Sequence, residues 1–388
     1  MMPCLLRKVA PQNFRSPQFT KPTGTAQHYK AAGLKNLRKL LEDRSNARVR
    51  NRDKVLPVTT TKRQHNKSSR LRITQAKKLS ISIVGAGRLG LALGLALKDA
   101  GYLIDLVVTR RPSSAKRAGV ILHAAAAHVG RKPLFDLPLR YAELLARTDV
   151  IIIATPDDSI AQIAVELGKL LQSEKTTRHP STSVVMHTSG ALTSRVLQPL
   201  QQLGFSTASL HPLISISDSS RGAEAVSCAY ISLEGDAAAI RLAKRLMSDL
   251  GGDTFVIKAK HKPLYHAAAL MASPNLTALF DVSAEMMTRC GLSMHDALQV
   301  LLPLVRSTVD NLAHQKPARA LTGTFKRGDI GTIKKHLDAI ASQRLTDALI
   351  AYAVLGKRSV KLSSLTAKQK MEIELLLDRA LRRRSKRR

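Results

Sequence analysis

The segment LSISIVGAGRLGLALGLALKDAG, residues 79–101, decides the fold. It begins as a short β-rich apolar run, turns through glycines, and continues as an apolar helical pattern that ends at Gly101. The same alternation of strand and helix continues to about Lys258. It predicts a doubly wound α/β domain with a parallel sheet over residues 79–258, because strands that alternate with helices form parallel sheets covered on both faces.

The glycines of this turn follow the spacing G-x-G-x-x-G and stand directly between a strand and a helix, the context in which this motif binds a dinucleotide. Gly85 would allow the tight turn, Gly87 the close approach of a pyrophosphate, and Gly90 close packing of helix on strand. We therefore assign the whole loop to cofactor binding: Gly85, Ala86, Gly87, Arg88, Leu89 and Gly90.

The second predicted strand ends in Thr109, Arg110 and Arg111. An NAD-binding domain usually has an acidic residue here, which holds the ribose 2′-hydroxyl and would repel a 2′-phosphate. Guanidinium groups pair with a phosphate instead, so these residues favour NADP(H) as the cofactor. The alternative is that they are surface arginines of a basic protein.

Three further predicted strands end in polar residues, and ligands of open α/β sheets bind beyond these carboxyl ends. Thr155 and Pro156 follow one strand and are expected at the cofactor. His187 and Ser189 follow the next strand, and His211 stands at the end of a third, where a nicotinamide and a substrate would lie. Each could instead serve a turn or cap a helix.

The segment KPLYHAAALMASPN, residues 262–275, begins an apolar helix. Pro263 suits the first helical position, which makes Lys262 the expected cap and places His266 on the same face one turn later. The positive end of a helix lowers the pKa of cationic groups, which suits proton donors. Alternatively, Lys262 is exposed to solvent, and His266 lies between the domains and makes its hydrogen bonds within the protein. Pro274 is expected to kink the helix. Asn275 could form hydrogen bonds with the backbone groups that the kink releases, or it could contact a substrate.

After Lys258 the strand patterns stop. Helical patterns follow at residues 261–290, 294–314, 329–340 and 343–355, and they predict an all-helical second domain over residues 259–365 for substrate binding or dimerisation. Two arginines of this domain, Arg306 and Arg327, could clamp a substrate carboxylate. Arg327 could equally pair with Asp329 in a capped turn.

The formal net charge of +34 is unevenly placed, and about half of the excess lies in residues 1–78. That segment has no steady hydrophobic period, and we interpret it as a basic disordered extension. Residues 366–388 are expected to be a basic C-terminal tail. Both ends could bind nucleic acid, and the extension could alternatively be an organellar transit peptide or translated upstream sequence.

Composition limits the remaining classes. Aromatic residues make up 3% of the chain and tryptophan is absent, which argues against a stacking surface for single-stranded nucleic acid. The three cysteines match no metal-binding spacing, so no metal is expected. The longest apolar run is interrupted by Arg88 and glycines, so we expect no membrane span and a cytoplasmic protein, or an organellar one if residues 1–78 contain a transit peptide.

The motifs GAGRLG, TPDDSI, HTSGAL, SLHPL, KPLYHAAALMASPNLTAL, LLPLVRSTVDNL and ALTGTFKRGDIGTIKKHLDAI occur in this order. Together they resemble an uncharacterised family that joins a Rossmann-like NAD(P)-binding domain to a helical domain of unknown function, over Leu79 to Ala353. More distantly, the layout is similar to pyrroline-5-carboxylate reductase, ketopantoate reductase, and the 6-phosphogluconate and β-hydroxyacid dehydrogenases.

This resemblance implies a nicotinamide-dependent reductase and a homodimer formed through the helical domain. Lys262 falls where β-hydroxyacid dehydrogenases place a catalytic lysine, but their amide partner one turn later is His266 here.

The leading hypothesis is an NADP(H)-dependent oxidoreductase that transfers hydride to or from a small carbonyl or imine compound. The catalytic candidates are His266, Lys262, His211 and Ser189, and the candidates for substrate binding are His187, Asn275, Arg306 and Arg327. The rival hypotheses are a non-catalytic NADP(H)-binding sensor or scaffold and a plain nucleic-acid-binding protein.

Overall fold

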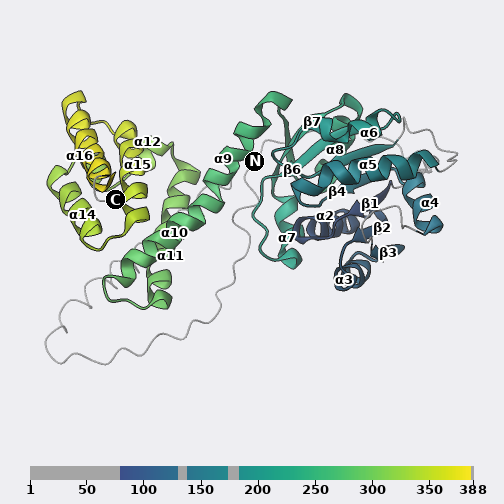
Figure 1. Cartoon of the computed structure of the whole chain (residues 1–388), viewed down its shortest axis with the longest axis horizontal. Coiled ribbons are helices and arrows are strands. Elements are labelled where there is room, and N and C mark those ends of the chain that lie inside the picture. Colours follow the sequence, from purple (N-terminus) through teal and green to yellow (C-terminus); the bar gives the residue numbers. More distant parts are fainter. Residues whose placement is uncertain (1–78, 130–137, 174–182, 386–388) are drawn as a thin grey trace, which may run out of the picture. The chain divides into compact units, whose positions relative to one another are not determined.

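The structure, a computed structural model, describes residues 79–129, 138–173 and 183–385 (Figure 1). The predicted extension over residues 1–78, with its alternatives of a transit peptide and a nucleic-acid-binding arm, lies outside the described residues.

An eight-stranded sheet forms the centre of the first domain within the described residues, in the order β3-β2-β1-β4-β5-β6-β7-β8. Strands β1 to β6 pair in parallel, and the sequence order of the strands reverses between β1 and β4. The strands are β1 (Ser80–Val84), β2 (Leu103–Thr109), β3 (Ala126–Val129), β4 (Val150–Ile153), β5 (Val184–His187), β6 (Ser206–Pro212), β7 (Tyr230–Gly235) and β8 (Asp253–Val256).

Helices cover both faces of this sheet, as the doubly wound prediction requires (Figure 1). Alternate residues of one strand face opposite cores, so Val150 and Ile152 pack with one set of helices and Ile151 and Ile153 with the other. The helices are α2 (Arg88–Asp99), α3 (Pro112–Leu122), α4 (Leu139–Arg147), α5 (Asp157–Ser173), η3 (Ser194–Leu197), α6 (Gln198–Gln201), α7 (Ser219–Ser227) and α8 (Ala237–Asp249).

Two details of the sheet differ from the sequence prediction. By composition, the alanine-rich segment after Arg111 favours one continuous helix, but α3 ends at Leu122, His123 takes a left-handed φ of 47°, and β3 follows. Pairing of β3 with the edge strand β2 overrides the helix propensity of its alanines. Strand β7 runs antiparallel to β6, so the sheet is mostly, and not wholly, parallel.

The second domain contains helices and no strands among its described residues. Its first predicted helix is in fact two, because α9 ends at Ala272 and α10 begins at Pro274, whose nitrogen cannot donate a helical hydrogen bond. The helices are η4 (Ala259–His261), α9 (Lys262–Ala272), α10 (Pro274–Thr288), α11 (Met294–His314), α12 (Pro317–Ala320), α13 (Thr324–Arg327), α14 (Ile330–Ser342), α15 (Thr346–Leu362) and α16 (Ala367–Ser385).

The segment predicted as a basic C-terminal tail is largely the helix α16. Ile373 and Leu377 of α16 are fully buried in one core with Ile333 of α14 and Val360 of α15. The helical domain therefore extends past the predicted boundary at residue 365. None of the helices in the described part of the chain has the length and apolar character needed to cross a membrane.

Candidate cofactor cavity and histidine cluster

The glycine loop after β1 has the geometry that its sequence predicts. Gly85 has a φ of +99°, and a Cβ there would lie 2.8 Å from the Ala154 carbonyl oxygen. A Cβ on Gly90 would lie 2.0 Å from the Gly85 carbonyl oxygen, so only glycine lets α2 approach β1 this closely. A Cβ on Gly87, which caps α2, would meet nothing within 4 Å. Its backbone is therefore open to a ligand.

A cavity of about 520 Å³ lies against this loop, at the carboxyl ends of β1, β2 and β4. Eight of the predicted cofactor-binding residues line it: Gly85, Ala86, Gly87, Thr109, Arg110, Arg111, Thr155 and Pro156. The predicted residues Arg88, Leu89 and Gly90 do not line the cavity, because they already belong to α2.

One wall of the cavity comes from α5, and the sequence prediction missed it. Asp158, Gln162 and Glu166 line the cavity together with Ser159 and Ile163. The spacing of four residues places these side chains on one face of the helix. This periodicity was the available signal, but it does not by itself distinguish a cavity wall from a solvated face.

The cavity residues fit a dinucleotide. The Thr155 Oγ1 atom is buried and has no hydrogen-bond partner among the described residues, so it can donate to a ligand at no internal cost. Arg110 and Arg111 are exposed at the end of β2, where their guanidinium groups can pair with a phosphate. The Thr109 hydroxyl proton is already used within the turn, because Oγ1 donates to the Arg111 carbonyl at 3.0 Å.

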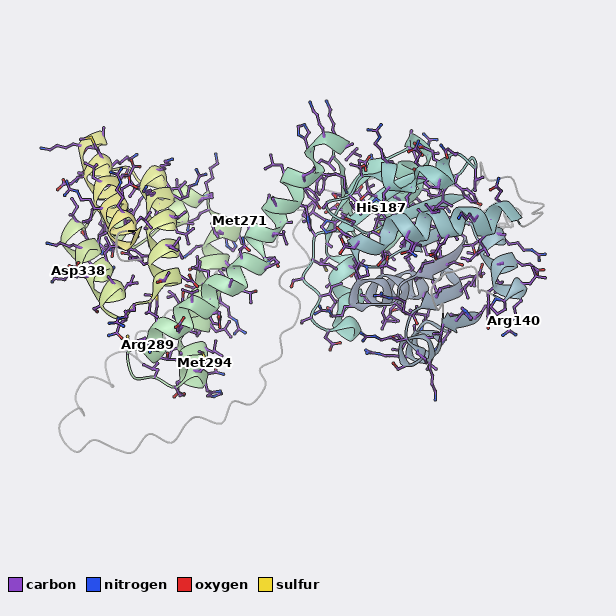
Figure 2. All side chains as sticks on the ribbon, in the orientation of Figure 1. Arg140, His187, Met271, Arg289, Met294 and Asp338 are labelled. Atoms are coloured by element: carbon purple, nitrogen blue, oxygen red, sulfur yellow. The ribbon has the colours of Figure 1, made fainter. Side chains whose placement is uncertain are left out.

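His187, at the end of β5, uses both of its ring nitrogens inside the protein. It is fully buried in the α/β domain (Figure 2). The Ser189 N–H donates to Nδ1 at 3.2 Å, which leaves Nε2 to donate to the Thr193 carbonyl at 3.1 Å. Burial lowers the pKa of His187 to about 4, so the ring is neutral near pH 7. His187 therefore shapes the turn after β5 and does not reach a ligand.

The Ser189 hydroxyl is likewise occupied. It donates to Asp157 Oδ2 at 2.7 Å and accepts from the backbone N–H groups of Ala191 at 3.2 Å and Leu192 at 3.0 Å. Asp157 stands between the cavity residues Pro156 and Asp158. This bond therefore ties the turn after β5 to the cavity wall, and Ser189 has no free hydroxyl for covalent chemistry.

Lys262 begins α9 and is fully buried. The cap of this helix is His261, one residue earlier than the predicted cap. The Lys262 Nζ donates to Ser209 Oγ at 2.6 Å and to the Ser189 carbonyl at 3.2 Å, so it anchors α9 to β6 and to the turn after β5. Burial lowers the pKa of Lys262 to about 8, against the opposing effects of the Glu234 and Asp157 carboxylates.

Two imidazoles and a phenol meet beside this anchor. His211 Nδ1 and the Tyr265 hydroxyl form a hydrogen bond of 2.8 Å. The His266 ring stands edge-on to His211, with 5.7 Å between centroids and an angle of 87° between planes. A Cβ on Gly190 would lie 2.5 Å from His266 Cδ2 and 2.9 Å from His211 Nε2, so only glycine lets both rings sit over this turn. We call His211, Tyr265, His266 and Gly190 the histidine cluster.

Charge and burial set the state of this cluster. Burial, with smaller contributions from repulsion by His266 and Lys262, lowers the pKa of His211 to about 4. Tyr265 is a member that sequence reasoning missed. Its spacing of three from Lys262 places it on the same helix face, which was the available signal.

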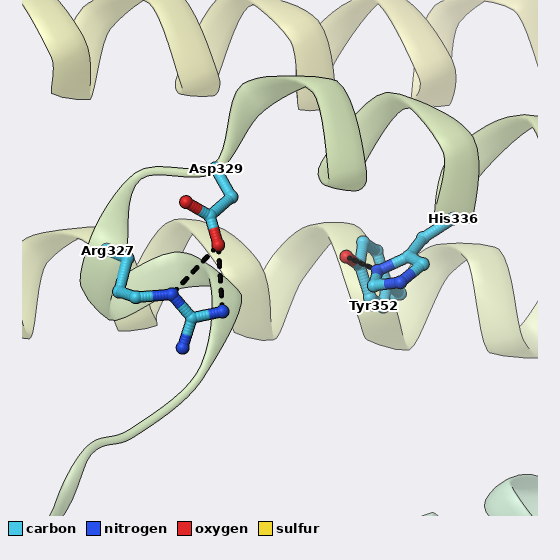
Figure 3. Close-up of polar contacts among 4 residues, drawn as sticks. All are labelled: Arg327, Asp329, His336 and Tyr352. Carbon is cyan, nitrogen blue, oxygen red and sulfur yellow. Dashed lines mark hydrogen bonds and ion pairs between the residues drawn. The ribbon is translucent and has the colours of Figure 1, made fainter.

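Three predicted substrate-binding residues make no contact with the histidine cluster in the described structure. Asn275 is exposed, and its Nδ2 lies 3.0 Å from Met271 Sδ. Arg306 is exposed on α11. Arg327 pairs with Asp329, with Nε and Nη2 2.9 Å and 2.8 Å from the same oxygen (Figure 3). The predicted pairing of Arg327 with Asp329 is therefore present, but the Asp329 side chain does not cap α14.

Models of two known protein domains match two successive parts of the chain. Residues 62–212 match a Rossmann-like domain, and residues 229–359 match a domain of unknown function designated DUF2520. The chain thus joins a Rossmann-like domain to a DUF2520 helical domain, which confirms the predicted resemblance. No curated protein matches the chain.

Solved structures share the fold at low sequence identity. A Bacteroides fragilis protein, provisionally named an NADP oxidoreductase, is 19% identical with a TM-score of 0.56, covering 73% of this chain and 98% of its own. A Thermotoga maritima protein is 23% identical with a TM-score of 0.54, over 73% of this chain and 98% of its own. Pyrroline-5-carboxylate reductase from Coxiella burnetii is 14% identical with a TM-score of 0.45, over 74% and 100%. For the first two structures the likeness concerns the fold, and it does not assign a reaction.

Proposed function

We propose that the protein is an NADP(H)-dependent oxidoreductase that transfers hydride to or from a small carbonyl or imine compound. One observation carries the proposal: a dinucleotide-sized cavity and a cluster of titratable rings lie at the same edge of the sheet, joined by residues 155–157. In open α/β sheets this edge, at the point where strand order reverses, is where ligands bind.

Different cavity residues would bind different parts of the cofactor. The open backbone at Gly87 and the first turn of α2 would receive the pyrophosphate. The Arg110 and Arg111 guanidinium groups would pair with a 2′-phosphate, which is the reason to prefer NADP(H) over NAD(H). When bound, a nicotinamide supplies a hydride; the residues of the chain must position the substrate and supply the proton.

The histidine cluster is the part of the site suited to the proton. Reduction of a carbonyl or imine leaves an oxygen or nitrogen that must be protonated. We assign this task to His266, whose ring meets His211 over Gly190; His211, which is neutral near pH 7, would donate a hydrogen bond to the substrate. The fully buried Lys262 would hold α9 in place, since both groups that its Nζ contacts belong to the protein. His187 and Ser189 would shape the turn.

Binding and turnover test the proposal separately. Fluorescence titration should give much tighter binding of NADPH than of NADH, and equal affinities would contradict the role of the two arginines. A panel of keto acids, aldehydes and imines should then reveal NADPH oxidation that His211→Asn and His266→Ala each reduce by about 100-fold or more. His314→Ala, on the exposed end of α11, is the control and should leave turnover unchanged. NADPH binding without oxidation of NADPH by any compound would favour a non-catalytic sensor instead.

We also propose that two copies associate through α10 and α11. These helices pack on each other, yet each buries only one residue fully, Ala284 and Ala297. Large apolar side chains remain exposed along them: Leu276, Leu279, Met294, Leu298, Val300, Leu302, Leu304, Val309 and Leu312. A monomeric soluble protein rarely exposes so extensive an apolar surface. A second copy with the same surface is the occupant that we expect.

Light scattering tests this association. The wild-type chain should have twice the 42.3 kDa mass of one chain, and Leu304→Glu should lower the mass toward that of a monomer. Lys334→Glu, an exposed charge reversal on α14, should leave the mass unchanged. A monomeric wild type, or a Leu304→Glu variant that remains dimeric, would contradict the proposal.

A further inference from the structure

The hydrogen bond between His211 and Tyr265 decides which nitrogen of His211 carries a proton. His211 comes from the end of β6 and Tyr265 from the first turn of α9. The 2.8 Å distance from Nδ1 to the phenol oxygen is that of a formed hydrogen bond. A neutral imidazole has one N–H and one acceptor nitrogen, so the direction of this bond fixes the tautomer.

The chemistry of the two groups sets that direction. A phenol O–H is a much stronger acid than a neutral imidazole N–H, and an imidazole nitrogen is a better acceptor than a phenol oxygen. The O–H of Tyr265 therefore donates to Nδ1 of His211. Burial raises the pKa of Tyr265 and lowers that of His211 to about 4, so both groups are neutral near pH 7.

The second nitrogen of His211, Nε2, then carries the ring proton. The edge of the ring that carries Nε2 faces the Gly190 turn, where a Cβ would lie 2.9 Å from it. The structure gives Nε2 no hydrogen-bond partner among the described residues. We propose that Tyr265 is a positioning residue that fixes His211 as the Nε2–H tautomer, so that the site presents a donor to an acceptor atom such as a carbonyl oxygen.

The consequence for the substrate rests on the proposed function. A ketone or aldehyde oxygen has lone pairs that accept the Nε2–H bond, and the bond polarises the C=O group toward hydride addition. A protonated imine has no lone pair on nitrogen and would meet an N–H donor with its own N–H groups. The cluster therefore selects the carbonyl from the two substrate classes.

Nitrogen NMR of the histidine side chains tests the tautomer without a cofactor or substrate. In the full-length protein at about pH 7, long-range proton–nitrogen spectra should show His211 with a protonated Nε2 and a bare Nδ1, with His211→Asn providing the assignment. Tyr265→Phe should convert this signal to a mixture of both tautomers. Tyr230→Phe, at an exposed tyrosine on β7, should leave it unchanged.

Either of two results would overturn the inference: His211 protonated on Nδ1 in the wild type, or an unchanged His211 signal in Tyr265→Phe. Because this readout does not involve NADPH, it stands or falls independently of the oxidoreductase proposal. Where turnover is found, Tyr265→Phe should lower kcat for a carbonyl compound on the order of tenfold and leave the Kd for NADPH unchanged.

Discussion

Replacing Lys262 by methionine should remove a pH-dependent contribution to stability. The side chain is fully buried, and its Nζ contacts Ser209 Oγ and the Ser189 carbonyl. Burial disfavours the charged form and lowers the pKa of Lys262 from 10.5 to about 8. Methionine retains much of the apolar stem and carries no charge, so the substitution isolates the effect of the amine.

The direction follows from comparing folded and unfolded chains. Below about pH 8 the amine is protonated in both, and burying its charge costs about 3 kcal/mol, at about 1.4 kcal/mol for each tenfold change in acidity. Between about pH 8 and 10.5 the unfolded chain still holds a proton that the folded chain has released. Stability therefore rises with pH across this window. From about pH 7.5 to 9.5 the expected gain is about 2 kcal/mol.

Urea denaturation followed by circular dichroism would measure this gain. Other groups also titrate in the window, so the quantity to compare is the change in unfolding free energy between the two pH values in wild type and in Lys262→Met. The wild type should gain about 2 kcal/mol more than the variant. Lys260→Met, at an exposed lysine two residues earlier, should behave like the wild type. Equal pH dependence in wild type and Lys262→Met would refute the claim that Lys262 is buried with a lowered pKa.

Three further predictions concern the cavity and the histidine cluster. Alanine at both Arg110 and Arg111 should weaken NADPH binding about 10- to 100-fold and leave NADH binding unchanged in fluorescence titrations, because the charge-assisted bonds would go to the 2′-phosphate. Thr155→Val should weaken NADPH binding about fivefold without lowering the melting temperature, since its Oγ1 has no partner in the described structure to lose. Gly190→Ala should lower kcat about 100-fold at unchanged NADPH affinity, because the new methyl group would lie 2.5 Å from His266 Cδ2 and displace the cluster.

The sequence predicts the fold well where local pattern and long-range pairing agree. The apolar run before Gly85, the glycine loop and α2 combine strand, turn and helix signals in one short segment. The signal misleads where tertiary pairing overrides local preference. Alanines 124–127 favour a helix by propensity, yet the chain pairs with β2 there as an edge strand. The antiparallel direction of β7 also depends on the course of the preceding connection, which periodicity does not report.

The sequence located the candidate site more reliably than it assigned roles within it. His187, Ser189 and His211 were predicted at the carboxyl ends of their strands, and in the structure they lie at one edge of the sheet. Whether a polar group faces a ligand or satisfies a neighbour depends on hydrogen-bond partners. His187 and Ser189 are used internally, and Tyr265 enters the site through a bond that residue spacing alone does not reveal.

Burial also separates the roles of Lys262 and His266, which the sequence placed as an equivalent pair on one helix face. The Lys262 side chain is fully buried, and Ser209 Oγ and the Ser189 carbonyl accept hydrogen bonds from its Nζ, whereas His266 is half-buried against His211. The two residues thus share a face but differ in access to a ligand.

Asp157 connects the cavity with the cluster electrostatically. It begins α5, where the positive end of the helix favours a carboxylate, and it accepts the Ser189 hydroxyl. Its negative charge raises the pKa values of Lys262, His187 and His211, opposing the larger effect of burial in each case. A polyanionic cofactor bound beside Pro156 and Asp158 would add negative charge near this carboxylate. Because added negative charge favours the protonated form of neighbouring groups, cofactor binding would raise the pKa values of the histidine cluster.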